Sequence, residues 1–267
     1  MSRYLEGAEA LEGATDATIV VLPLGAHENH GPHLPPETDT LIATGLARRL
    51  ARAVPPEVDL RILPAEAVGY SPEHTSFPGT LTLPAAELIE RWVGIGRALH
   101  ERGCRRLLLL NAHGGNVPVA QIVAQELRLL PMLAVATKWD RFLRTSDLVP
   151  ERERALGIHG GLIETSVMLE LHPHLVDMEA AQDFPSRQEE FATTFRHLLA
   201  YGPHAFGWMA EDLNPVGAMG DAASATAILG ERLTVLSIGG LAGVVEDMGR
   251  FELALFAPRH DLSGAST

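Results

Sequence analysis

Residues 105–116 read RRLLLLNAHGGN, and the four consecutive leucines decide the fold class. A strand that is apolar on both faces needs cover on both faces, which is typical of a parallel sheet. The chain after it predicts a helix over 118–130 and another strand over 132–139. This succession indicates a βαβ unit, in which a helix returns the chain to begin a parallel neighbour.

The same alternation extends toward the N-terminus. The β-branched run TIVVLPLG predicts a strand that ends in a Pro/Gly loop. The elements predicted in this half are strands at 18–25 and 60–63 and helices at 39–53 and 85–101. Together with the βαβ unit they predict an α/β protein, a three-layer α/β/α sandwich with a mainly parallel sheet. We expect one domain over residues 1–267.

The remainder of the chain predicts more helix than strand. The elements expected there are a helix at 163–171, a polar helical excursion at 180–200 and a largely helical segment at 221–248. Gly239 and Gly240 are expected to interrupt the last segment. The charged run ERERA at 151–155 is expected to be solvated.

Composition excludes several classes of protein. The chain has 267 residues, 46% of them hydrophobic, which is typical of a globular protein. With a formal net charge of −13, neither nucleic acid nor an anionic membrane is an expected partner. The single cysteine, Cys104, cannot form an internal disulfide, and the N-terminal MSRYLEGAEA lacks the pattern of a signal peptide. We therefore expect a cytoplasmic protein.

The richest group of potential metal ligands follows the first predicted strand, in GAHENHGPHLPPETDT at 25–40. Its imidazoles and carboxylates are His27, Glu28, His30, His33, Glu37 and Asp39. Loops at the carboxyl ends of the strands in such a sheet meet where ligands bind. Imidazole combined with carboxylate suits Zn²⁺ or Mn²⁺ better than Ca²⁺ or Mg²⁺. The alternative is a polar surface loop with scattered histidines.

Two further loops carry a histidine beside a glycine pair. In NAHGGN (111–116), the glycines allow backbone to approach a metal or substrate, and His113 is either a ligand or a turn residue. In IHGGLIETS (158–166), His159 and Glu164 flank the glycines ahead of a helix. Glu164 is either a functional carboxylate or a first-turn acid that the helix dipole favours.

These strings, together with SPEHTSFPGT at 71–80, resemble the motifs of the creatininase family of metal-dependent amidohydrolases. The resemblance implies the α/β/α fold and two divalent metals per subunit, Zn²⁺ and/or Mn²⁺. It also implies a small-molecule amide substrate and a homo-oligomer, commonly a hexamer.

The resemblance assigns roles residue by residue. It makes Glu28, His30, Asp39 and His113 metal ligands, with Asp39 bridging both metals. Glu164 matches a later glutamate and is expected to complete the second metal's shell as a ligand and catalytic residue.

His159 matches the catalytic acid or base of creatinine-hydrolysing members. The residues expected to contact the substrate or to support the ligands are His33, Ser71, Glu73, His74, Gly114, Gly115 and Trp139. Creatinine-hydrolysing members continue the His113 loop with Tyr-Glu, whose glutamate is a ligand, so Gly114 and Gly115 remove one ligand.

We expect hydrolysis of a cyclic amide or a related small C–N bond by a water that two metals activate. The alternatives are a small-peptide hydrolase of the mycofactocin-maturation type, a formamide hydrolase (deformylase), and, more remotely, a metal-stabilised binding subunit without turnover. Creatinine itself is not the expected best substrate, because Ala155 stands where creatinine-hydrolysing members have a tryptophan.

Overall fold

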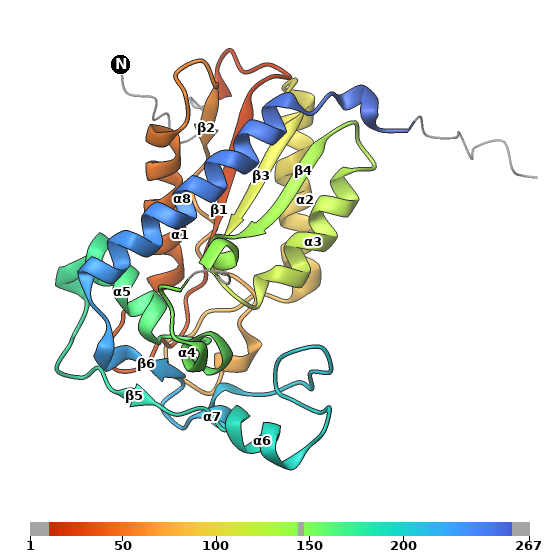
Figure 1. Cartoon of the computed structure of the whole chain (residues 1–267). Coiled ribbons are helices and arrows are strands. Elements are labelled where there is room, and N and C mark those ends of the chain that lie inside the picture. The colour runs from red at the N-terminus through yellow and green to blue at the C-terminus, as the bar shows by residue number, and fades with distance from the viewer. Residues whose placement is uncertain (1–10, 144–146, 258–267) are drawn as a thin grey trace, which may run out of the picture.

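A four-stranded parallel sheet forms the centre of the molecule (Figure 1). The structure is a computed structural model that describes residues 11–143 and 147–257. In the spatial order β2-β1-β3-β4, the strands are β1 (Ile19–Leu24), β2 (Leu60–Ile62), β3 (Arg106–Asn111) and β4 (Leu133–Lys138). All neighbouring pairs are parallel, so the carboxyl ends of the strands lie at one edge.

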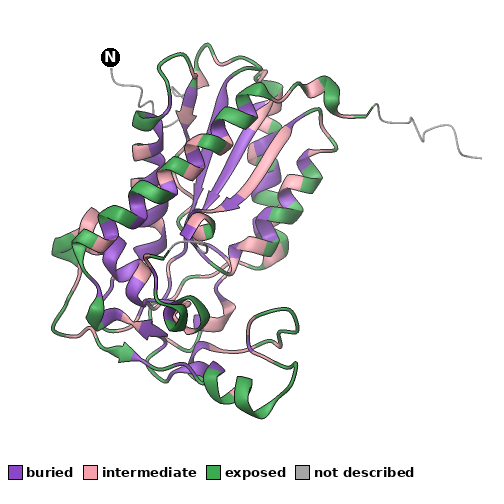
Figure 2. Cartoon of the chain, viewed as in Figure 1, coloured by how far each residue is buried: buried purple, intermediate pink, exposed green. Residues whose placement is uncertain are grey.

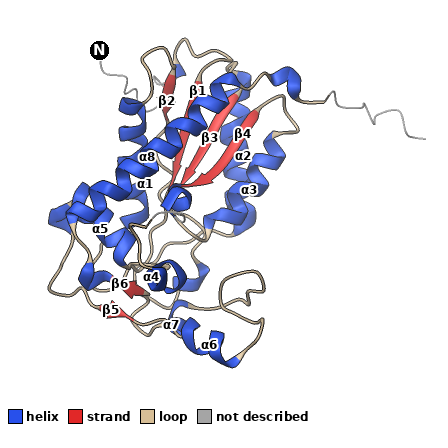
Figure 3. Ribbon diagram, viewed as in Figure 1, coloured by secondary structure: helices blue, strands red, loops and turns tan. Residues whose placement is uncertain are grey.

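Helices cover both faces of this sheet (Figure 3). One face carries α1 (Thr38–Ala53), α5 (Leu162–Leu171) and α8 (Ala227–Arg250), and the other carries α2 (Ala85–Glu101) and α3 (Asn116–Leu127). The leucines of β3 serve both cores, with Leu108 and Leu110 on the first side and Leu107 and Leu109 on the second. All four are fully buried. Figure 2 shows buried residues gathered in the central strands of the sheet. The expected three-layer α/β/α fold is confirmed.

α8 runs unbroken from Ala227 to Arg250, so the expected interruption at Gly239 and Gly240 is wrong. A Cβ on Gly240 would lie 2.2 Å from the ring of Phe142, which belongs to the 3₁₀ turn η3 (Trp139–Leu143). Gly240 therefore permits close packing of α8 on η3 and does not end the helix.

Among the described residues, α8 is also the one helix whose length and mean hydropathy would suffice to cross a membrane. Of its most apolar 18-residue window, 33% is buried, where α8 joins the core that α1 and α5 share.

The polar helical excursion expected over 180–200 is confirmed only for the short α6, and the rest of the range is not helical. That region contains β5 (Asp183–Phe184), α6 (Gln188–Thr194) and a loop, before α7 (Ala210–Leu213) and β6 (Gly220–Asp221), which pairs antiparallel with β5. The buried Gln188 side chain donates to Tyr201 O and accepts from Ala200 N. These side-chain bonds satisfy the loop backbone and favour the loop over a longer helix. Short 3₁₀ turns occur at η4 (Pro173–Leu175), η5 (Ala222–Ser224) and η6 (Leu253–Leu255).

Candidate metal centre

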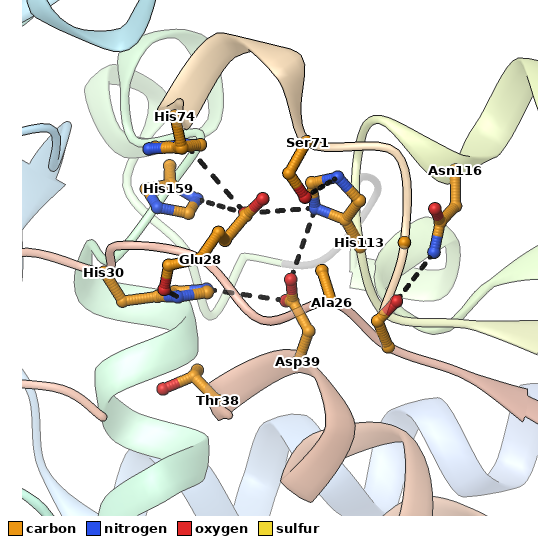
Figure 4. Close-up of polar contacts among 12 residues, drawn as sticks. Ala26, Glu28, His30, Thr38, Asp39, Ser71, His74, His113, Asn116 and His159 are labelled. Carbon is orange, nitrogen blue, oxygen red and sulfur yellow. Dashed lines mark hydrogen bonds and ion pairs between the residues drawn. The ribbon is translucent and has the colours of Figure 1, made fainter. Parts of the chain in front are cut away.

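Four side chains converge at the carboxyl ends of β1 and β3 (Figure 4). Glu28 and His30 lie in the loop after β1, and Asp39 lies in the first turn of α1. His113 lies in the loop after β3. All four are buried. The parallel pairing of β1 with β3 thus brings His113 to three predicted ligands that lie far earlier in the sequence.

The nitrogen and oxygen atoms of these side chains face one another. His113 Nδ1 lies 3.1 Å from Glu28 Oε1 and 3.2 Å from Asp39 Oδ2. His30 Nε2 lies 3.5 Å from Asp39 Oδ1. Asp39 therefore stands between two imidazoles, which is the placement required of a carboxylate shared by two metals.

Backbone carbonyls determine which nitrogen of each ring faces the centre. Tyr70 O lies 2.8 Å from His113 Nε2, and Glu28 O lies 3.1 Å from His30 Nδ1. A carbonyl oxygen only accepts, so each of these nitrogens donates a proton to it. The other nitrogen of a neutral ring then directs its lone pair at the carboxylates, as in metal-binding histidines.

Several atoms at the centre lack a hydrogen-bond partner within the described part of the chain. They are both carboxylate oxygens of Glu28, Asp39 Oδ2 and His30 Nε2. Leaving a buried polar group unpaired costs about 1 to 3 kcal/mol, and more when it is charged. A divalent cation would satisfy all of these atoms at once. The residues present therefore fit a metal centre, and their donor set suits Zn²⁺ or Mn²⁺.

Without a cation, protons on the imidazoles balance the carboxylates. Burial would raise the pKa of Glu28, but attraction to His113 and His159 lowers it to about 2. Burial would lower the pKa of His30, but the nearby Asp39 raises it to about 9. The pKa of His113 is likewise raised, against burial, by Glu28 and Asp39. A bound metal would displace these protons.

His159 and His74 approach Glu28 from the side opposite His113 (Figure 4). His159 Nε2 lies 2.6 Å from Asn29 O and donates to it, so the lone pair is on Nδ1, 3.5 Å from Glu28 Oε1. His74 Nε2 lies 3.9 Å from the same oxygen, and the His74 and His159 rings are 4.4 Å apart. Burial lowers the pKa of His159, and that of His74 to about 3, so both rings are mainly neutral at pH 7.

Glu164 lies in the first turn of α5, where its Oε2 accepts a hydrogen bond from Gly160 N at 2.7 Å. Glu164, His30 and His159 form a possible ligand set, in which the ligand atoms lie within 4.8 Å of one another. Glu28 belongs to three further sets: with His74 and His159, with Glu73 and His113, and with His30 and Asp39. Both expectations for Glu164, ligand and first-turn acid, are compatible with this position.

Ser71 and Glu73 border the His113 side of the centre. Ser71 Oγ lies 3.3 Å from His113 Nε2, and Glu73 Oε1 lies 3.8 Å from the same nitrogen. Burial raises the pKa of Glu73. Gly114 is exposed, whereas Gly115 packs directly against the ring of His113.

The side chains of four other residues from the sequence analysis make their contacts outside this cluster. His33 Nε2 lies 2.9 Å from Thr165 Oγ1, so His33 contacts α5. Trp139 is buried in the core next to β3 and α8. His27 and Glu37 form a pair at the surface, with 3.7 Å between His27 Nδ1 and Glu37 Oε1.

Glu153 positions the His159 loop, a role that the sequence patterns did not reveal. It lies in α4 (Glu151–Leu156) and is buried, so the expectation that all of 151–155 is solvated is wrong. Its oxygens accept from Leu162 N at 2.7 Å and from Asp221 N at 3.0 Å. A Cβ on Gly157, Gly161 or Gly220 would lie 2.1 to 2.5 Å from this carboxylate. These three glycines leave space for the Glu153 carboxylate, which becomes visible only in the folded structure.

Comparison with known proteins places this geometry in context. The family model described as creatininase, creatinine amidohydrolase, matches residues 4–245. A mycofactocin precursor peptide peptidase from Mycolicibacterium smegmatis is 30% identical over 226 residues, which cover 84% of this chain and 83% of that protein. A creatinine amidohydrolase from Pseudomonas putida is 34% identical over 195 residues, which cover 66% of this chain and 73% of that protein.

A solved structure described as creatininase Mn superposes with a TM-score of 0.71 at 26% sequence identity. The superposition covers 90% of this chain and 93% of the other. The family match at residues 4–245 includes the sheet and the loops that carry the candidate centre.

Proposed function

Because the chain belongs to the creatininase family of hydrolases, we propose that it is a metal-dependent amidohydrolase that cleaves an amide C–N bond. The observation that carries this proposal is Glu28, whose buried oxygens face three imidazoles and lack a hydrogen-bond partner among the described residues. The proposed cofactors are two divalent ions, Zn²⁺ and/or Mn²⁺. Glu28, His30, Asp39, His113 and Glu164 would hold them.

The chain's own residues have distinct tasks in this proposal. When bound, the metal pair supplies an activated water and an electrophile for the amide carbonyl oxygen. Asp39 contacts both His30 and His113 and keeps the two halves of the centre together. His159 holds a free Nδ1 beside Glu28, because its Nε2 proton is engaged by Asn29 O. His159 therefore can receive a proton and pass it to the departing nitrogen, which no amide expels readily as an anion.

The substrate class that we propose first is a cyclic amide, or a related small compound with a C–N bond, bulkier than creatinine. Ala155 is an exposed small residue, so it offers no aromatic surface for a flat ring. An aromatic contact is worth about 0.5 to 1.5 kcal/mol beyond the area it buries, or up to about tenfold in affinity. Gly114 and Gly115 likewise present no side chain to a small ring.

A short peptide is the second candidate substrate. It is favoured by the peptidase relative from M. smegmatis, whose similarity spans a larger share of this chain than that of the P. putida creatinine amidohydrolase. Both substrates present an amide carbonyl, so the same centre would serve either reaction.

The test combines metal content with turnover on a panel of creatinine, cyclic ureides, formamides and short peptides. We expect about two divalent ions per chain, loss of activity in chelator, and slower turnover of creatinine than of the best substrate. Metal-free protein with full activity in chelator would overturn the metal-dependent mechanism. Creatinine as the fastest substrate would overturn the substrate assignment.

A further inference from the structure

Glu73 reaches the His113 side of the centre from a segment outside the sheet. It lies in the 3₁₀ turn η2 (Pro72–His74). Its Oε1 is 3.8 Å from His113 Nε2, and its side chain is 16% exposed. Glu73, Glu28 and His113 form a set whose ligand atoms lie within 4.8 Å of one another. A largely buried carboxylate thus stands beside the fully buried Glu28.

Gly115 leaves the space that this arrangement needs. A Cβ at position 115 would lie 2.1 Å from Tyr70 O, 2.5 Å from His113 Nε2 and 3.2 Å from Glu73 Oε1. The first two distances are too short for any side chain, and Tyr70 O is the backbone group that orients His113. A side chain at 115 and the observed position of the Tyr70–Glu73 segment therefore exclude each other.

The charge of two divalent ions is compatible with a fourth carboxylate, Glu73, at the centre. The four candidate ligand sets contain four carboxylates, namely Glu28, Asp39, Glu73 and Glu164. Two divalent cations bring four positive charges, and buried charge is tolerated when opposite charge compensates it. The four carboxylates alone match this charge, whereas three of them would need a further anion, such as the hydroxide formed from the activated water.

Glu28 points independently to a bound cation in this centre. It is fully buried, and neither of its oxygens has a hydrogen-bond partner within the ranges that the structure describes. Its Oε1 lies 3.1 Å from His113 Nδ1.

We infer that Glu73 is a metal-binding residue of this centre, which reaches it from η2 while Gly115 keeps the intervening space clear. The inference rests on the proposed function, because it requires the metal centre. It assigns the loop at 69–80 a direct part in holding metal, in addition to supporting His113.

Metal binding by Glu73→Gln tests this inference without relying on turnover. The same substitution at Glu90, exposed on α2, is the matched control. Zn²⁺ affinity is measured by competition with a chromophoric chelator, and the Co²⁺-substituted protein gives a visible spectrum that reports coordination. Substitution of a residue that only supports a metal ligand typically lowers metal affinity about 10 to 100-fold. We therefore expect Glu73→Gln to lower the affinity for one of the two ions at least about 10-fold. We also expect an altered Co²⁺ spectrum, with Glu90→Gln unchanged in both.

Gly115→Ala provides a second, independent variant that retains Glu73. Its Cβ would displace the Tyr70–Glu73 segment, so we expect weakening of the same ion. Wild-type affinity and an unchanged Co²⁺ spectrum in Glu73→Gln would overturn the inference while leaving the proposed function intact. If Glu73→Gln does not fold, wild-type affinity in Gly115→Ala overturns it instead. Wild-type protein that binds no metal would overturn both.

Discussion

Asp39 is the residue whose loss should remove the most metal. It contacts His30 through one oxygen and His113 through the other, so both halves of the centre depend on it. We expect Asp39→Ala to lower bound metal from about two ions per chain to less than one, more than Ala substitution of any other proposed ligand. Elemental analysis of purified protein measures this. A larger loss in His30→Ala or His113→Ala would contradict the shared position of Asp39.

His159 should matter for turnover more than for metal retention. Proton transfer by a positioned side chain typically contributes about 10² to 10⁴-fold, so we expect His159→Ala to lower kcat within that range. Its metal content should remain near wild type. His159 also belongs to possible ligand sets with Glu28 and with His30. Loss of metal in His159→Ala would therefore show coordination and contradict the proton-transfer role.

The metal-free protein should lose stability as the pH rises from about 6.5 to about 9. Burial lowers the pKa of His30, but attraction to Asp39 outweighs burial. The pKa in the folded state is therefore raised from 6.5 to about 9. The His30 proton therefore stabilises the folded state fully below pH 6.5, and this contribution disappears as pH rises through about 9. Its size is roughly 3 kcal/mol. Denaturant unfolding in chelator, at about pH 6.5 and about pH 9, measures this loss of stability. Equal free energies of unfolding at the two pH values would contradict the prediction.

Two adjacent glycines of α8 should respond oppositely to alanine. A Cβ on Gly240 would lie 2.2 Å from the Phe142 ring, whereas a Cβ on Gly239 would meet nothing within 4 Å. Overpacking costs about 1 to 3 kcal/mol, while alanine at an open helical position gains about 0.5 to 1 kcal/mol over glycine. We expect Gly240→Ala to lower the free energy of unfolding and Gly239→Ala to raise it. Equal effects in thermal and denaturant unfolding would argue against the close contact between α8 and η3.

Strand and helix periodicity predicted the sheet and its two covering layers because the signal is local. Leu107 to Leu110 alternate between two cores. A run in which every position is apolar was enough to predict a strand covered on both faces. The errors arose where tertiary contacts decide. Gly240 lies inside an unbroken helix, where it makes room for Phe142. The side chain of Gln188 holds a loop where the polar sequence predicted helix.

At the scale of the whole molecule, part of the candidate centre could likewise be predicted from the sequence and part could not. Glu28, His30 and His113 follow strands whose carboxyl ends share one edge, so their convergence could be expected from strand order. His74 and Glu153 approach from η2 and α4, outside the sheet. Strand order does not position such segments, and their distances to Glu28 or to the His159 loop depend on packing that no local pattern encodes.

The outer surface of α8 leads us to propose a homo-oligomer, most simply a hexamer as the family resemblance implies. Ile228 is 74% exposed and Val235 is 65% exposed, one heptad apart on this helix. Exposed apolar side chains that share a helix surface are typical of subunit contacts. We expect Ile228→Asp and Val235→Asp to shift the protein to smaller species in sedimentation at micromolar concentration. Ile122→Asp, on α3 in the opposite layer, is the matched control and should leave assembly unchanged. A wild-type monomer, or dissociation by Ile122→Asp alone, would refute assembly through α8.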